Sequence, residues 1–114
     1  MGKTDFDEIL WNAIDELMSF LGESGKYALF YHIEKRFQIK PLDIPDKLDG
    51  FHHALEALFG DGTKVIERMI AKNLYENLGL VFKEHKDWTL EEYVEYAKGG
   101  QRKDGDARAK EKQS

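Results

Sequence analysis

Two neighbouring histidines in the middle of the chain are the residues best placed to bind a metal ion. His52 and His53 are followed by Glu56, and in a helix His52 and Glu56, four residues apart, lie on the same face. This spacing can chelate zinc, but a competent site needs a third or fourth protein ligand. His32 and His85 are the other histidines, and the sequence places neither of them beside this group. We therefore predict that the chain holds no metal ion and no cofactor.

The chain also lacks the usual arrangement of a catalytic nucleophile. It contains no cysteine, and its serines, Ser19, Ser24 and Ser114, lie outside the glycine-flanked pattern that exposes a nucleophile on a sharp turn. Its 22 acidic residues are so numerous that close carboxylate pairs are expected without any catalytic purpose. We predict that the protein is not an enzyme, and the sequence indicates no small-molecule substrate.

A basic stripe is the first of two candidate binding surfaces. Lys64, Arg68 and Lys72 are four residues apart and therefore follow one face of a predicted helix. This helix follows the turn at residues 60–62, so residues 51–78 resemble a helix-turn-helix whose second helix meets DNA. However, residues up to Lys98 hold 19 acidic and only 12 basic side chains, a net charge of −7 that repels phosphate backbones. Nucleic-acid binding through this stripe is therefore the alternative function.

The second candidate surface lies on the first predicted helix. Ten of the sixteen residues from Phe6 to Leu21 are apolar, and Trp11 and Met18 lie on the same flank. A helix this apolar is either surrounded by the rest of the domain or presents a patch to a partner. Tryptophan and methionine are favoured in the cores of protein interfaces. We predict that Trp11 and Met18 contact a protein partner or a second copy of the chain.

The spacing of apolar residues predicts an all-α fold. A composition of 41% hydrophobic and 12% aromatic residues supports a packed core in a chain of 114 residues, which has room for one domain. Both prolines lie between residues 39 and 46, which we expect to form an extended connector with apolar anchors at Ile39, Leu42 and Ile44. The short apolar run at 80–82 is either a strand or a packed connector. Helices are predicted over residues 6–21, 24–37, 51–59, 62–78 and 90–98.

Two helix ends carry specific local signals. Thr89 and Glu92 have the spacing of a capping box, and Trp88 and Tyr93 that of a hydrophobic staple, so a helix is expected to begin at about residue 90. The preceding helix is expected to end at Gly79 in a Schellman motif, in which Leu80 reaches back to Tyr75.

These elements predict a compact bundle of about five helices over residues 4–98. Residues 99–114 contain no apolar residue larger than alanine, so we expect a disordered, charged tail. No stretch is long and apolar enough to span a membrane, the beginning of the chain does not resemble a signal peptide, and cysteine is absent. We therefore expect a cytoplasmic protein without a membrane partner.

Residues 31–80 resemble a family of small archaeal helical domains called Nitrosopumilus output domain 5. The resemblance rests on packing and capping residues rather than on a functional signature. It implies an archaeal regulatory or output module and carries over no catalytic residues. The similar segments are residues 31–37 (Tyr-His-Ile-Glu-Lys-Arg-Phe), 41–45 (Pro-Leu-Asp-Ile-Pro), 51–56 (Phe-His-His-Ala-Leu-Glu), 59–62 (Phe-Gly-Asp-Gly) and 74–80 (Leu-Tyr-Glu-Asn-Leu-Gly-Leu).

Overall fold

The computed structural model describes residues 5–102, together with the side chains of residues 5–99. This part of the chain contains five α-helices and two short 3-10 helices and no strand, which confirms the all-α prediction. The α-helices are α1 (Asp5–Met18), α2 (Gly22–Phe37), α3 (Leu48–Phe59), α4 (Gly62–Leu78) and α5 (Leu90–Arg102). The 3-10 helices are η1 (Ser19–Leu21) and η2 (Pro41–Asp46).

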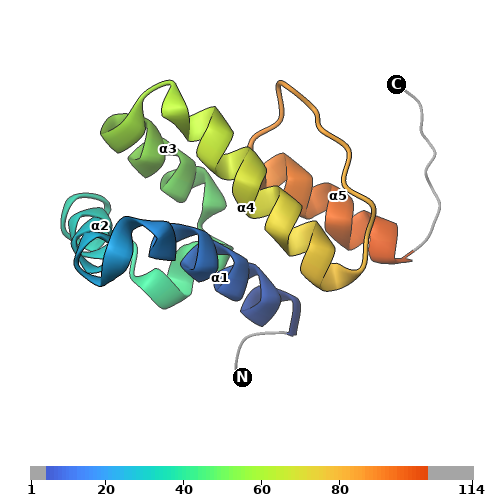
Figure 1. Cartoon of the computed structure of the whole chain (residues 1–114), viewed down its shortest axis with the longest axis horizontal. Helices are drawn as coiled ribbons and strands as arrows, with labels where there is room; N and C mark the ends of the chain where they lie inside the picture. The colour runs from blue at the N-terminus through green and yellow to red at the C-terminus, as the bar shows by residue number, and fades with distance from the viewer. Residues whose placement is uncertain (1–4, 103–114) are drawn as a thin grey trace.

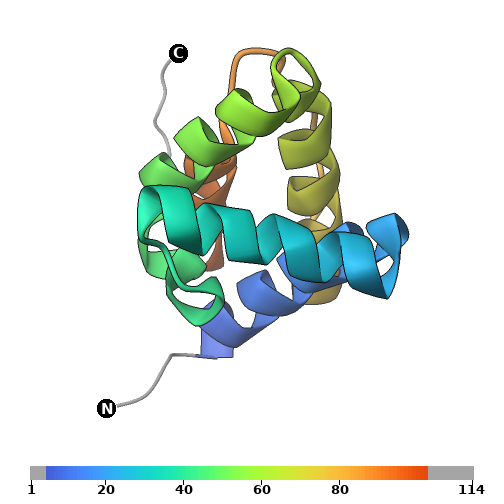
Figure 2. The same ribbon diagram turned by 90° about the vertical axis from the view of Figure 1, so that its left-hand side faces the viewer.

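The helix α4 is the central element of the bundle. It packs against α1, α3 and α5 (Figure 1). The helix α2 crosses one end of the bundle and contacts α3 (Figure 2). The core between the helices is aliphatic with a few aromatic rings, and its largest fully buried side chains include Leu10, Ile14, Met18, Ile33, Ile44, Phe51, Leu55, Ile70, Leu74, Leu90 and Tyr93.

The buried face of α4 includes two polar residues and leaves two large apolar residues outside. Val65 and Met69 are each 47% exposed. Their places in the core are taken by Thr63 and Glu67, which are 2% and 1% exposed and precede the buried Ile70 on the same face. The face of α4 that turns inward is therefore rotated from the most apolar one, because three other helices have to pack around it.

The connector between α2 and α3 is helical rather than extended, so that prediction is wrong. Lys40 is the last extended residue, and η2 starts at Pro41, whose fixed φ and missing N–H suit the first position of a helix. The N–H of Asp43 then donates to the carbonyl of Lys40 at 2.9 Å. Ile44 is fully buried, whereas Leu42 is 62% exposed and does not anchor the connector.

The junction between α1 and α2 is also tighter than predicted. The first helix changes to 3-10 geometry after Met18, and α2 already begins at Gly22 rather than at Ser24. Gly22 has φ of +84°, a value that side-chain-bearing residues rarely adopt, so this glycine permits the immediate change of direction. The helix α3 begins at Leu48, between the two acids, Asp46 and Asp49, that the sequence offers as caps.

Both local helix-end signals are confirmed. At the end of α4, Gly79 is left-handed, and the N–H of Leu80 donates to the carbonyl of Tyr75 at 2.9 Å. At the start of α5, the N–H of Thr89 donates to Glu92 at 2.8 Å, the N–H of Glu92 donates to the Thr89 hydroxyl at 3.4 Å, and the rings of Trp88 and Tyr93 lie 5.1 Å apart.

The last helix is longer than predicted. It continues through Gly99 to Arg102, because a glycine in helical geometry costs only about 1 kcal/mol and does not by itself end a helix. The predicted tail therefore overlaps α5 at residues 99–102, and its remainder, residues 103–114, lies outside the described residues.

The loop between α4 and α5 packs on aromatic rings. The Tyr93 hydroxyl accepts from the N–H of His85 at 2.8 Å and donates to its carbonyl at 3.0 Å. The Tyr75 hydroxyl donates to the carbonyl of Tyr93 at 2.7 Å. Leu80 and Phe82 pack against the core, whereas Val81 is 80% exposed, so the apolar run at 80–82 is a connector and not a strand. None of the described helices combines the length and the apolarity required to cross a membrane.

Candidate functional site

A buried carboxylate joins three helices at one end of the bundle. Glu67 of α4 is 1% exposed, and both of its carboxylate oxygens lie within 3.0 Å of Nδ1 of His52 on α3. The backbone N–H of Leu90, the first residue of α5, also donates to this carboxylate. Glu67 therefore places a negative charge at the N-terminus of α5, where the helix dipole favours it.

The pKa values of both partners are raised, for different reasons. For Glu67, burial raises the pKa of the carboxyl and outweighs the hydrogen bond and charge of His52 and the N–H of Leu90, which lower it. For His52, burial lowers the pKa of the imidazole, but the hydrogen bond to Glu67 and the negative charges of Glu67, Glu56 and Asp49 together raise it above 6.5. A protonated His52 is thus favoured in the folded protein.

This pair makes the stability of the fold depend on pH. A folded-state pKa above the unfolded value means that the folded protein binds the proton more tightly, so its stability falls as pH rises. The contribution of His52 is complete below about pH 6.5 and is lost as pH rises through its folded-state pKa. We expect the free energy of unfolding, measured by urea denaturation, to decrease as pH rises from about 6.5 through the folded-state pKa of His52. His52→Gln should flatten this decrease, and an unchanged slope in that variant would contradict the assignment.

The histidines and acids of α3 do not assemble into a metal site. Nε2 of His52 faces Glu56 at 3.3 Å, so both of its ring nitrogens are occupied by carboxylates. The neighbouring His53 is exposed, and its Nδ1 bonds instead to the carbonyl of Asp49 at 2.8 Å. Across the part of the chain that the structure describes, no group of three or more histidine, aspartate or glutamate side chains could hold a metal ion.

The second candidate site is a pocket beside Trp11. The Trp11 ring is half-buried, with its centroid 5.4 Å from that of Phe30. The open side of this ring faces a pocket of about 330 Å³ between α1 and η2. We call it the Trp11 pocket, and it is lined by Asp7, Glu8, Trp11, Asn12, Leu42 and Pro45.

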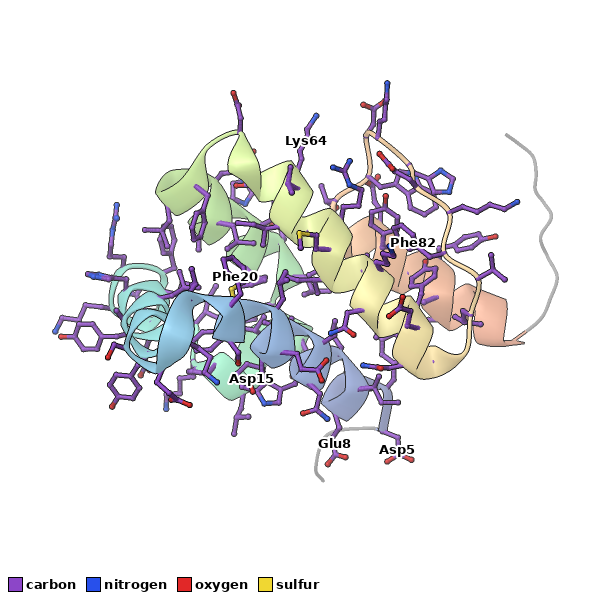
Figure 3. All side chains as sticks on the ribbon, in the orientation of Figure 1. Asp5, Glu8, Asp15, Phe20, Lys64 and Phe82 are labelled. Atoms are coloured by element: carbon purple, nitrogen blue, oxygen red, sulfur yellow. The ribbon has the colours of Figure 1, made fainter. Side chains whose placement is uncertain are left out.

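Acidic side chains form the charged part of the Trp11 pocket. The first turn of α1 holds Asp5, Asp7 and Glu8. Figure 3 shows Asp5 and Glu8 projecting from the beginning of this helix. Asp7 and Glu8 are the charged residues that line the pocket.

Met18 does not belong to this surface, so its prediction as a partner contact is wrong. It is 1% exposed and belongs to the core, since α1 packs against α4. Of the two predicted partner contacts, the structure leaves only Trp11 accessible.

The three residues of the basic stripe lie on α4 as predicted, but acids accompany each of them. Arg68 pairs with Glu84 of the following loop at 2.8 Å. Lys72 lines a shallow hollow together with two glutamates, and Lys64 lines a pocket together with several carboxylates. The positive potential of the stripe is therefore largely offset, and nucleic-acid binding by Lys64, Arg68 and Lys72 stays a prediction.

Sequence reasoning missed residues at both sites. Leu42 and Pro45 were expected to form a connector, and nothing in their spacing places them beside Trp11. Glu67 is not among the residues predicted at either site. The burial of Glu67 could be predicted in part, because it lies three residues before the apolar Ile70 and therefore on the same helical face.

No family model, no curated protein and no solved structure matches this chain. The resemblance of residues 31–80 to the archaeal output-domain family stays a prediction.

Proposed function

We propose that the protein is a cytoplasmic regulatory or accessory module, not an enzyme, that binds a basic segment of another protein in the Trp11 pocket. The observation that carries this proposal is the combination of an open tryptophan face, the exposed Leu42 and two lining carboxylates in one pocket. A regulatory role would also agree with the output-domain resemblance.

The chemistry of the pocket defines the segment that would fit. Trp11, Leu42 and Pro45 offer apolar contact to one large side chain, and burial of such a side chain is worth about 1.5–3 kcal/mol. Asp7 and Glu8 favour lysine or arginine beside that side chain. The excess of acidic residues over the whole domain would speed the approach of a basic partner and would slow that of a nucleic acid.

A displayed library of random peptides tests the proposal directly. We expect the selected peptides to place an aromatic or large aliphatic residue next to lysine or arginine. Trp11→Ala should weaken binding of a selected peptide by roughly tenfold or more, because about 1.4 kcal/mol of contact is lost. Glu8→Lys should weaken the same peptide and should make binding less sensitive to salt.

The matched control is Lys64→Glu/Arg68→Glu, which changes charge on another face of the bundle. This variant should bind the peptide as well as the wild type does. Selected peptides without basic residues, or undiminished peptide binding by a folded Trp11→Ala variant, would overturn the proposal. Salt-sensitive binding of random duplex DNA that is lost in the control variant would instead support the nucleic-acid alternative.

A further inference from the structure

The buried pair of His52 and Glu67 forms the floor of a second, more polar pocket. Its volume is about 340 Å³, at the lower end of the range for ligand sites, and it lies between α3, the start of α4 and the loop before α5. We call it the Glu67 pocket, and it is lined by His52, Glu56, Gly60, Asp61, Thr63, Lys64, Glu67, Asp87, Trp88 and Thr89.

Negative charge predominates in the Glu67 pocket. Four lining residues carry carboxyl groups, and only His52 and Lys64 can offset them. The imidazole of His52 is already held between Glu56 and Glu67, at 3.3 and 2.9 Å. A cation entering the pocket would therefore meet carboxylates from α3 and from the loop at Asp87. The N–H of Leu90 in the first turn of α5 is not available to bind an anion, because it already donates to Glu67.

One wall of the pocket is aromatic and held in place. Trp88 stacks on His85 with the ring centroids 3.7 Å apart and the planes 13° from parallel. Its indole also packs against Tyr93 and against Tyr96, at 5.1 and 5.6 Å. Aromatic faces attract planar cations, and the guanidinium group stacks on them more often than ammonium does.

An unpaired hydroxyl in the wall of the pocket is an independent feature that favours a polar ligand. Thr63 lines the pocket and is 2% exposed, and its Oγ1 has no hydrogen-bond partner among the described residues. Leaving a buried polar group unpaired costs about 1–3 kcal/mol, so most such groups in folded proteins have a partner. A donor placed in the pocket would provide one after a small shift of the side chain.

From these observations we propose that the Glu67 pocket binds a guanidinium group. This planar cation carries five N–H donors, which match carboxylate oxygens of Glu56 and Asp87 and the hydroxyl of Thr63, while its face lies against Trp88. Its source is either an arginine side chain of a protein or a small free guanidinium compound, since both present the same chemistry.

The test is a titration followed by 1H–15N NMR of the whole chain with three probes. N-acetyl-arginine amide represents the protein side chain, methylguanidine represents a free compound of the same charge, and N-acetyl-citrulline amide is the neutral, nearly isosteric control of the arginine probe. We expect the two cationic probes to shift the Trp88 indole N–H and the amides of Thr63 and Thr89, and the citrulline probe to shift none of them. The probe that binds more tightly identifies the source.

Two sets of variants check where the guanidinium lies. Glu56→Gln/Asp87→Asn should weaken binding at least tenfold, whereas Glu34→Gln/Glu95→Gln, which removes two exposed acids elsewhere, should leave it unchanged. Lys64→Gln should strengthen binding, because it removes a competing positive charge. Equal binding of the citrulline probe, or unchanged binding in Glu56→Gln/Asp87→Asn, would overturn the proposal. Trp11→Ala separates the two sites, since it should weaken peptide binding in the Trp11 pocket roughly tenfold or more and leave guanidinium binding intact.

Discussion

Replacing Ile44 with alanine should lower the free energy of unfolding by about 3 kcal/mol, the usual cost of removing a large aliphatic side chain from a core. Ile44 is fully buried although it belongs to the six-residue helix η2 between α2 and α3. Truncating it would leave a cavity where η2 packs against α1 and α3. Urea denaturation followed by circular dichroism measures the change.

Leu42, two residues earlier in the same 3-10 helix, is the matched control. It is 62% exposed, so Leu42→Ala should change the free energy of unfolding by less than about 0.5 kcal/mol. The same variant should nevertheless weaken binding of a selected peptide, because Leu42 lines the Trp11 pocket. Equal losses of stability in the two variants would contradict the assignment of Ile44 to a buried face of η2 and of Leu42 to an exposed face that binds the peptide.

The second large effect is expected at Glu67. Glu67→Ala removes the acceptor of both His52 and the Leu90 N–H, and it leaves a cavity below a histidine that favours its charged form. Removing one member of a buried charged pair costs about 3–5 kcal/mol, so we expect a loss of about 3 kcal/mol near neutral pH. Thermal or urea denaturation measures it.

Two further variants separate the lost pairing from the lost volume. Glu67→Gln keeps the size and one acceptor oxygen, and it should cost about 1–2 kcal/mol. In a double-mutant cycle with His52→Ala, the loss caused by Glu67→Ala should be smaller than in the wild type, since the partner is already absent. Strict additivity of the two substitutions would mean that the hydrogen bond contributes nothing to stability.

The features that could be predicted from the sequence are those that depend on interactions between residues close together in the chain. The capping box of Thr89 and Glu92 and the Schellman motif at Gly79 depend on side chains and backbone groups at most five positions apart. The recurrence of apolar residues three and four positions apart likewise predicts five helices, because each helix must bury one face whatever its neighbours are.

The features that could not be predicted depend on which helices meet. The most apolar face of α4 includes Val65 and Met69, yet the packing of α1, α3 and α5 turns Glu67 inward and leaves Met69 half-exposed. Met18 and Trp11 are both large residues of one apolar helix, and only the position of α4 decides that Met18 is core. The burial of Glu67 also depends on other helices, because its carboxylate is paired with His52 of α3 and with the N–H of Leu90 of α5.

The cap that Glu67 provides for α5 has a consequence for how the chain folds. Leu90 lies 23 positions after Glu67, so α5 receives this N-terminal acceptor only when it has packed against α4. Conversely, detaching α5 would remove one hydrogen-bond donor from the Glu67 carboxylate. Helices joined in this way gain and lose their structure together, so α3, α4 and α5 belong to one cooperative unit.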